Sequence, residues 1–286
     1  MIETYVSADF EEPPAELAFE LRFADLLREV ERAAQLCLGL APGSSGLREA
    51  ATRLYIVTQA IPSVLLNYKI CIEFGLPLHP TQYIDFVRHE KNPEAYLPST
   101  REAAQELYLE AIDIARAVYR LDPRCAVRLS GLRGRIPEFL TGFLYSNTPD
   151  RYTWRASEPA RVQKLAQEIR ASGWTPDVIV GAAHGSIRPA LLLAEQLGSQ
   201  LYFLRFSMFK RDDEQPILSS ADERWLARFQ ERRLLLFDED VAKGRTLKAF
   251  ELRLSGFARE CRTASVLRHY LAPYQPSYVG EVFYDE

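Results

Sequence analysis

The chain has 286 residues, a formal net charge of −4 and a hydrophobic content of 47%. This composition indicates a folded globular protein long enough for two subdomains, and it argues against general nucleic-acid binding. The four cysteines are scattered and form no CxxC pair, so neither a zinc site nor a disulfide framework is predicted. Because no apolar run approaches about 18 residues and no signal-peptide pattern is present, we expect a cytoplasmic protein without a membrane partner.

The first 120 residues are predicted to be mostly helical. A helical pattern runs from Ala15 to Cys37, and a second runs from 47 to 74 with Pro62 as its expected kink or division. Residues 75–100 are rich in proline and are expected to form a loop, before a helix that Ser99 or Thr100 caps. Tyrosine and phenylalanine are frequent here, which favours a core or a dimer face over a substrate lid.

Two features of this half have competing interpretations. Arginines surround Gly131 and Gly134, so the segment is either a loop that receives a phosphate or, as we favour, a solvated turn. His79 and His89 flank a proline-rich loop at a spacing that suggests no metal site, so we expect them at the surface.

The second half alternates predicted helices and strands. Ser157 is expected to cap a helix that Gly173 ends, and residues 177–180 read as a short strand that runs into a loop of small residues. A helix follows from Pro189 to about Leu197, then a strand over 201–206 and a long polar stretch over 210–232. The order of these elements predicts a parallel α/β sheet with helices on its faces.

The segment 234–247 carries the clearest chemical pattern. Four apolar residues form a short buried strand, Asp238 and Glu239 follow it, and a turn at Gly244 opens a helix at Thr246. Backbone N–H groups at a helix start attract phosphate, and an acidic pair accepts from two vicinal hydroxyls or holds hydrated magnesium. A sugar phosphate satisfies both halves. A last buried strand is predicted over 263–270.

This segment resembles the phosphoribosyl-diphosphate (PRPP) binding motif of the type I phosphoribosyltransferases. Asp238 and Glu239 match its acidic pair, and Gly244, Thr246 and Leu247 match its loop, whereas Lys243 replaces the usual Thr or Ser. The loop after the first strand resembles the diphosphate loop of the same family, with His184 in place of Arg or Lys. The resemblance covers about residues 155–282. It implies a type I phosphoribosyltransferase-like domain over 151–286, after a helical domain of unknown role over 1–150.

The resemblance also implies roles for particular residues. Asp238 and Glu239 would be catalytic and would hold Mg²⁺, possibly through water, while a diphosphate loop and a 5-phosphate loop would hold the rest of PRPP. The remaining positions are a hood at Lys210 and Arg211 and an acceptor pocket. The diphosphate loop is Ala183, His184, Gly185 and Ser186; the 5-phosphate loop is Lys243, Gly244, Arg245, Thr246 and Leu247; the acceptor pocket is Arg268, Tyr270 and Tyr278.

The predicted activity is therefore magnesium-dependent transfer of ribose 5-phosphate from PRPP to a nitrogenous base or another small acceptor, by a homodimer. Four alternatives remain. The acidic segment is an ordinary solvated turn, or Asp238 and Asp240 form the Asp-x-Asp motif of a phosphatase, which the short remaining chain disfavours. The third is a non-catalytic protein that binds PRPP or a nucleotide as a regulator, and the fourth is an enzyme that cleaves a nucleotide by the reverse reaction.

Overall fold

The computed structural model describes residues 1–6, 13–78, 92, 94–148, 150–206 and 215–284. It divides into two compact units, Met1–Pro149 and Asp150–Glu286, each with its own buried core. Lys210, Arg211, His79 and His89 lie outside the described residues, so the predicted hood and the two histidines stay predictions.

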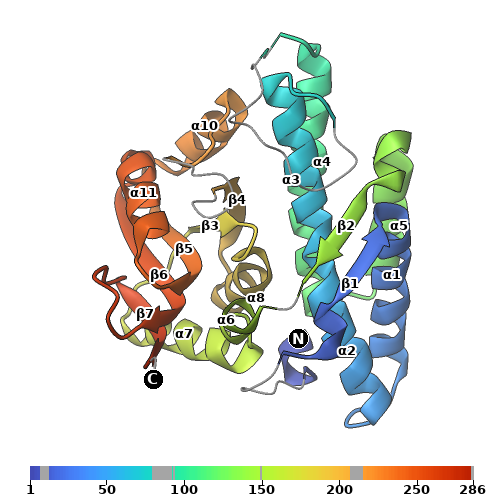
Figure 1. The fold of residues 1–286 in the computed structure, drawn as a ribbon, viewed down its shortest axis with the longest axis horizontal. Helices are drawn as coiled ribbons and strands as arrows, with labels where there is room; N and C mark the ends of the chain where they lie inside the picture. The colour runs from blue at the N-terminus through green and yellow to red at the C-terminus, as the bar shows by residue number, and fades with distance from the viewer. Residues whose placement is uncertain (7–12, 79–91, 93, 149, 207–214, 285–286) are drawn as a thin grey trace. The chain divides into compact units, whose positions relative to one another are not determined.

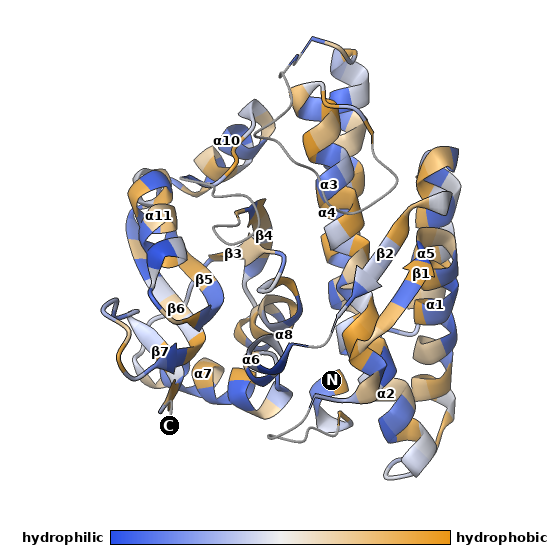
Figure 2. Cartoon of the chain, viewed as in Figure 1, coloured by the Kyte–Doolittle hydropathy of each residue, from blue (hydrophilic) through white to orange (hydrophobic). Residues whose placement is uncertain are grey.

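The first unit is built from helices and one short sheet. Helix α1 packs against α2 and α5, α3 packs against α4, and β1 pairs with β2 in antiparallel register. The bounds are η1 (Ile2–Thr4), η2 (Ala15–Leu17), β1 (Phe19–Arg22), α1 (Phe23–Gly39), α2 (Ser45–Thr58), α3 (Ala60–Phe74), α4 (Pro98–Arg120), α5 (Cys125–Arg135), η3 (Glu138–Gly142) and β2 (Leu144–Asn147). Hydrophobic and hydrophilic residues alternate along α1, which is typical of a helix with one buried face (Figure 2).

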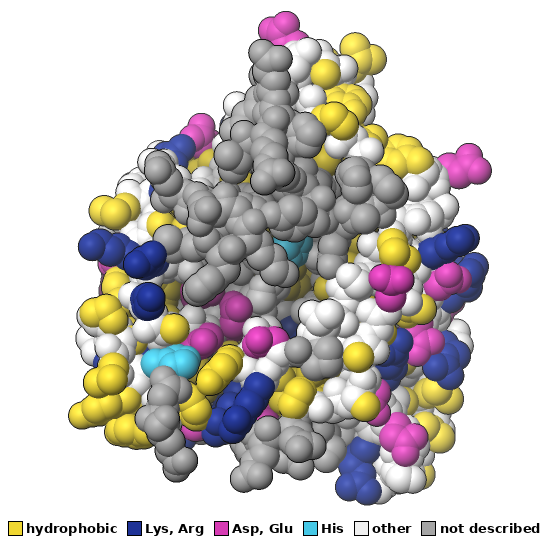
Figure 3. Space-filling model, viewed as in Figure 1, with side chains coloured by type: hydrophobic (Ala, Val, Ile, Leu, Met, Phe, Trp, Pro, Cys, Tyr) yellow, Lys and Arg dark blue, Asp and Glu magenta, His cyan; other side chains and the backbone are white. Residues whose placement is uncertain are grey.

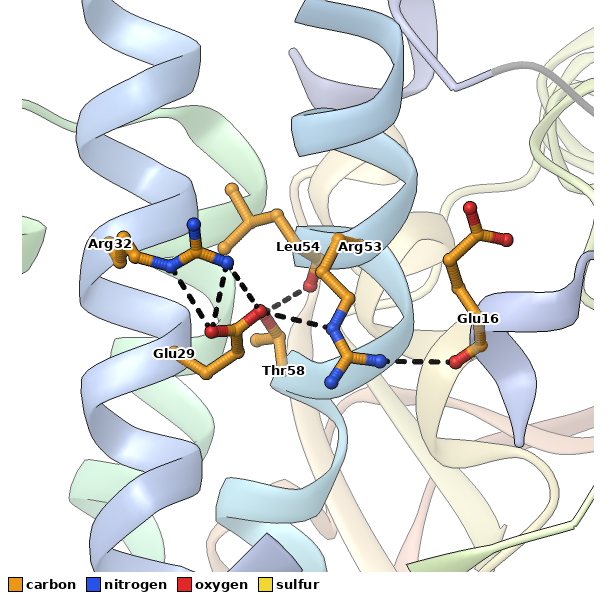
Figure 4. A network of polar contacts seen from close by, with 6 residues as sticks. All are labelled: Glu16, Glu29, Arg32, Arg53, Leu54 and Thr58. Atoms are coloured by element: carbon orange, nitrogen blue, oxygen red, sulfur yellow. Dashed lines mark hydrogen bonds and ion pairs between the residues drawn. The ribbon is translucent and has the colours of Figure 1, made fainter. Parts of the chain in front are cut away.

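A polar network joins α1 to α2 in this unit (Figure 4). The Glu29 carboxylate accepts hydrogen bonds from Arg32 and Arg53, and Arg53 also donates to the Glu16 carbonyl oxygen. Partial burial raises the pKa of Glu29, but the two guanidinium groups outweigh it and hold the pKa below its ordinary value. The network fixes the register of two helices at the edge of the core.

One described stretch, Ser45–Phe74, is long and apolar enough to cross a membrane by length and composition alone. The most apolar part of this stretch is completely buried within the protein, as expected for core helices. The chain breaks it at Gln59, three residues before Pro62, because proline lacks an N–H and disfavours helix in the turn that precedes it. The predicted division is therefore confirmed.

The second unit is a five-stranded parallel sheet in the order β4-β3-β5-β6-β7 (Figure 1). Right-handed crossovers from β3 to β4 and from β5 to β6 run in opposite directions, so α8 and α11 cover opposite faces. The bounds are α6 (Arg151–Arg155), α7 (Pro159–Ala171), β3 (Val178–Ala183), α8 (Ile187–Leu197), β4 (Gln200–Arg205), α10 (Ser220–Leu226), η4 (Ala227–Phe229), β5 (Arg233–Val241), α11 (Arg245–Leu254), η5 (Ser255–Phe257), β6 (Glu260–His269) and β7 (Tyr278–Phe283). The predicted fold class, a parallel α/β sheet after a helical region, is confirmed.

Several local predictions are wrong. The segment around Gly131 and Gly134 is helix α5 rather than a loop, so it offers no glycine turn to a phosphate. The first helix begins only at Phe23, after a short strand. Ser157 does not cap α7, because its hydroxyl donates to the Thr153 carbonyl and Glu158 takes the cap position.

Candidate functional site

The first candidate loop leaves the carboxyl end of β3. Strand β3 is buried along its whole length, the Ala183–His184 peptide bond is cis, and α8 begins at Ile187. Ser186 is fully buried and its hydroxyl donates to the Ala182 carbonyl at 2.5 Å, which holds the turn closed. The predicted diphosphate loop therefore stands at the N-terminus of an 11-residue helix, where backbone N–H groups favour an anion.

The acidic pair lies inside β5 rather than after it. The strand runs through Val241, and Asp238 pairs in register with Ser265 of β6. Asp238 is only 9% exposed, and its carboxyl group hydrogen-bonds to the side chains of Glu239 and Thr246. The hydroxyl of Thr246 thereby ties the acidic strand to the first turn of α11.

Both carboxyl groups have raised pKa values. Burial raises the pKa of Asp238, and the nearby negative charge of Asp240 adds to the effect. Burial also raises the pKa of Glu239, and Asp238 raises it further because two like charges at close range disfavour full ionisation. Without a bound cation or ligand, both groups therefore bind a proton more readily than isolated carboxyl groups do.

The second candidate loop joins β5 to α11. Gly244 occupies the N-cap with φ +72°, a conformation that favours glycine, and an added Cβ would lie 2.0 Å from the Tyr274 Cβ. The side chains of Lys243 and Arg245 are exposed, whereas Leu247 is fully buried in the core. The two cations therefore face solvent beside the start of α11, at the carboxyl edge of the sheet, where parallel sheets bind ligands.

Glu239 brings the first loop and the acidic strand together. A Cβ added at Gly185 would lie 1.7 Å from Glu239 Oε1, so the carboxyl group rests directly against the glycine backbone. Three of the predicted groups, the diphosphate loop, the acidic pair and the start of α11, thus meet at neighbouring strand ends.

Arg205, which the sequence pattern did not single out, also contacts this loop. It is the last residue of β4, it pairs in register with Ala183, and it is 3% exposed. Its Nη1 lies 2.6 Å from Nε2 of His184.

The structure places Tyr278 apart from the other two predicted acceptor residues, Arg268 and Tyr270. The Arg268 guanidinium is buried and donates to the backbone carbonyls of Tyr270, Ala272 and Tyr274, so it holds the loop after β6. Tyr270 is exposed and stacks on Tyr284. Tyr278 lies at the opposite, amino end of the sheet at the start of β7.

The residues at the carboxyl ends of β6 and β7 form a different cluster. His269 Nε2 lies 3.3 Å from the Asp240 carboxylate, two residues beyond Asp238 on β5. The His269 ring packs 5.6 Å from the Tyr152 ring and 5.5 Å from the Phe283 ring. We call Tyr152, Asp240, His269 and Phe283 the histidine cluster; it combines ring surface with hydrogen-bonding groups beside the acidic pair.

The donor set at this edge fits magnesium bound through water or a substrate. Asp238 and Glu239 supply carboxylate oxygens, which magnesium prefers. Within the described part of the chain no group of three or more His, Cys, Asp or Glu side chains is arranged to hold a metal, so the protein alone offers no complete cage. Magnesium normally completes its shell with water and substrate phosphates.

Among the described residues that Figure 3 shows, both units carry basic as well as acidic side chains. No family model matches the sequence, and no curated protein matches it significantly. Solved structures that resemble it include a purine phosphoribosyltransferase from Pyrococcus horikoshii, at 21% identity over 45% of this chain and 87% of that one, with a TM-score of 0.36. A hypoxanthine phosphoribosyltransferase from Staphylococcus aureus matches at 21% identity over 44% and 76%, with a TM-score of 0.35. A hypothetical protein from Neisseria gonorrhoeae with bound ppGpp matches at 20% identity over 46% and 80%, with a TM-score of 0.36.

Proposed function

We propose that the second unit is a magnesium-dependent phosphoribosyltransferase of the cytoplasm, which transfers ribose 5-phosphate from PRPP to a small nitrogenous acceptor and releases diphosphate. The observation that carries the proposal is the contact of Glu239 with Gly185, because it joins an acidic pair to an anion-binding loop. PRPP carries a diphosphate, two ribose hydroxyls and a 5-phosphate in that spatial order. The loop, the pair and the start of α11 offer complementary groups in the same order.

The chain's own residues have distinct roles in this proposal. The backbone of Gly185 and its neighbours binds the diphosphate, Asp238 and Glu239 accept from the ribose hydroxyls, and the start of α11 binds the 5-phosphate. As the bond from C1 to the diphosphate oxygen breaks, positive charge develops on the ribose, and the ionised pair stabilises it. Magnesium, held by Asp238 and Glu239 through water, would neutralise charge on the departing diphosphate.

The histidine cluster is the proposed acceptor pocket. Its rings provide a stacking surface, and His269 and Asp240 provide a hydrogen-bond donor and acceptor beside the pair. This assignment replaces Tyr278, which the structure places at the other end of the sheet.

A panel of nitrogenous bases and small aromatic acceptors, incubated with PRPP and Mg²⁺, tests the activity by diphosphate release. Release that requires both an acceptor and magnesium supports transfer. PRPP binding without diphosphate release in the presence of any acceptor would instead support the regulatory alternative. Release of inorganic phosphate from PRPP without an acceptor would indicate a phosphatase.

A further inference from the structure

Arg188 is a buried cation in the first turn of α8, directly after the diphosphate loop. Its exposed fraction is 3%, and its Nε has no hydrogen-bond acceptor within the described part of the chain. No carboxylate of those residues pairs with its guanidinium either. Because a guanidinium stays charged at every physiological pH, the fold holds a buried positive charge that the described residues do not neutralise.

The position of Arg188 is unfavourable for a cation without a ligand. The N-terminus of a helix carries partial positive charge, and the first turn of α8 holds no acidic residue to offset it. The guanidinium carbon lies 5.9 Å from the centroid of the Trp154 ring, close to the outer limit of about 6 Å for a cation–π contact. Since an unpaired buried charge destabilises the folded state, packing against Trp154 does not by itself explain an arginine here.

The neighbours of Arg188 offer a further donor rather than an acceptor. The Trp154 side chain is 1% exposed, and its indole Nε1 has no acceptor among the residues that the structure describes. Helix α6, which carries Trp154, also places Tyr152 against His269 at the carboxyl end of β6. Side chains of a helix lean toward its N-terminus, so Arg188 leans toward the diphosphate loop at the same edge of the sheet. A buried cation and a buried donor without acceptors indicate an anionic ligand.

We propose that Arg188 binds the diphosphate group: its guanidinium donates to phosphate oxygens at the start of α8, and the ligand supplies the negative charge that the described residues lack. The backbone N–H groups of the helix start and the guanidinium then bind the same anion. A planar guanidinium fork can donate to two phosphate oxygens at once, which gives orientation as well as charge. This inference rests on the proposed function, since it adds a residue to the same anion-binding loop.

The test compares the wild type with Arg188→Met and Arg188→Lys by calorimetric titration with inorganic pyrophosphate and, separately, with ribose 5-phosphate. Methionine keeps an unbranched side chain but removes the charge and the donors. We expect Arg188→Met to weaken pyrophosphate binding at least tenfold, and Arg188→Lys, which keeps the charge but not the fork, to recover part of the loss. Binding of ribose 5-phosphate should stay within twofold of the wild type, because it depends on the start of α11.

Stability without ligand separates a binding role from a structural one. If the charge of Arg188 is unpaired in the free protein, Arg188→Met should raise the urea concentration at which the second unit unfolds, whereas loss of a structural residue would lower it. Arg253→Met, at an exposed ion pair with Glu223, is the matched control. It should leave the affinity for both ligands within twofold of the wild type.

Several results would overturn the inference. Pyrophosphate binding by Arg188→Met that equals the wild type, equal losses for both ligands, or no pyrophosphate binding by the wild type would each do so. A lower urea midpoint for Arg188→Met, or failure of this variant to fold, would also overturn it, because Arg188 would then stabilise the free protein. A wild type whose pyrophosphate binding depends on Arg188 but which transfers nothing from PRPP would remove the proposed function while leaving this inference standing.

Discussion

Asp240 and His269 lie within hydrogen-bonding distance only because β5 and β6 are parallel neighbours, with Asp240 opposite Leu267 in the register. The sequence places them 29 residues apart, and nothing in either segment marks the pair. Arg205 and His184 are a second example, joined by the β3–β4 register. Local pattern therefore led to the prediction of the acidic pair and the two loops, whereas contacts that depend on strand pairing, such as that between Asp240 and His269, were not predicted.

The histidine cluster predicts an effect on the acceptor alone. His269→Ala should raise the KM for the acceptor about tenfold, because it removes a ring contact and a hydrogen-bonding group, while the KM for PRPP changes less than twofold. Steady-state kinetics with each substrate varied in turn measure both constants. Tyr278→Phe, at the amino end of the sheet, is the control and should alter neither. A change in both constants for His269→Ala would contradict the assignment.

The raised pKa values of the acidic pair predict how stability depends on pH. Between the ordinary carboxyl pKa of about 4 and the raised folded value, the folded protein binds more protons than the unfolded chain. The free energy of unfolding therefore falls as the pH rises through this window, when neither Mg²⁺ nor PRPP is present. Asp238→Asn removes one ionisable group. Relative to the wild type, the free energy of unfolding of the variant should therefore increase by about 2 kcal/mol as the pH rises.

Urea denaturation of the wild type and Asp238→Asn at pH 5 and pH 7.5 measures this difference. We expect the variant's advantage to be larger at pH 7.5. An equal difference at the two pH values would show that the pair does not retain a proton in the folded protein.

At the scale of elements, the strands and helices that build the site were predictable, whereas the edge strand β7 and helix α10 were not. Strands β3, β4 and β5 have continuous apolar runs between turn residues, so their positions follow from pattern. Strand β7 contains Gly280 and Glu281 and has no continuous apolar run, so it was not predicted; it pairs with the edge of β6. Helix α10 was not predicted because it lies in a polar stretch, although Ser219 and Asp222 form a capping box at its start.

The close approach of β5 to the β3–α8 loop predicts that a side chain at Gly185 displaces the Glu239 carboxyl group or the loop. In Gly185→Ala the new Cβ would collide with Glu239 Oε1, so either the loop or the carboxyl group must move. We expect PRPP affinity to fall at least tenfold, as measured by calorimetric titration. Gly256→Ala is the matched control, because an added Cβ there has nothing within 4 Å, and its affinity should equal that of the wild type. Normal binding by Gly185→Ala would contradict the proposed contact.

At the scale of the whole molecule, two units with separate cores predict two separable unfolding transitions. Saturation with PRPP and Mg²⁺ at about 100 times the Kd should stabilise only the second unit, by about 2.7 kcal/mol. Glu73→Ala should lower the unfolding temperature of the first unit alone. The reason is that Glu73 forms a buried ion pair with Lys69 at 2.5 Å on α3 of that unit. Differential scanning calorimetry of the full chain measures both shifts. A single transition that moves with both changes would contradict independent units.

The central claim is that the acidic pair and the two loops form one PRPP site. Calorimetric titration of the full chain with PRPP, with and without Mg²⁺, on the wild type and on Asp238→Asn, tests it most directly. The account predicts binding that depends on magnesium and that weakens at least tenfold in the variant. No binding to the wild type under either condition, or equal binding by both proteins, would contradict it.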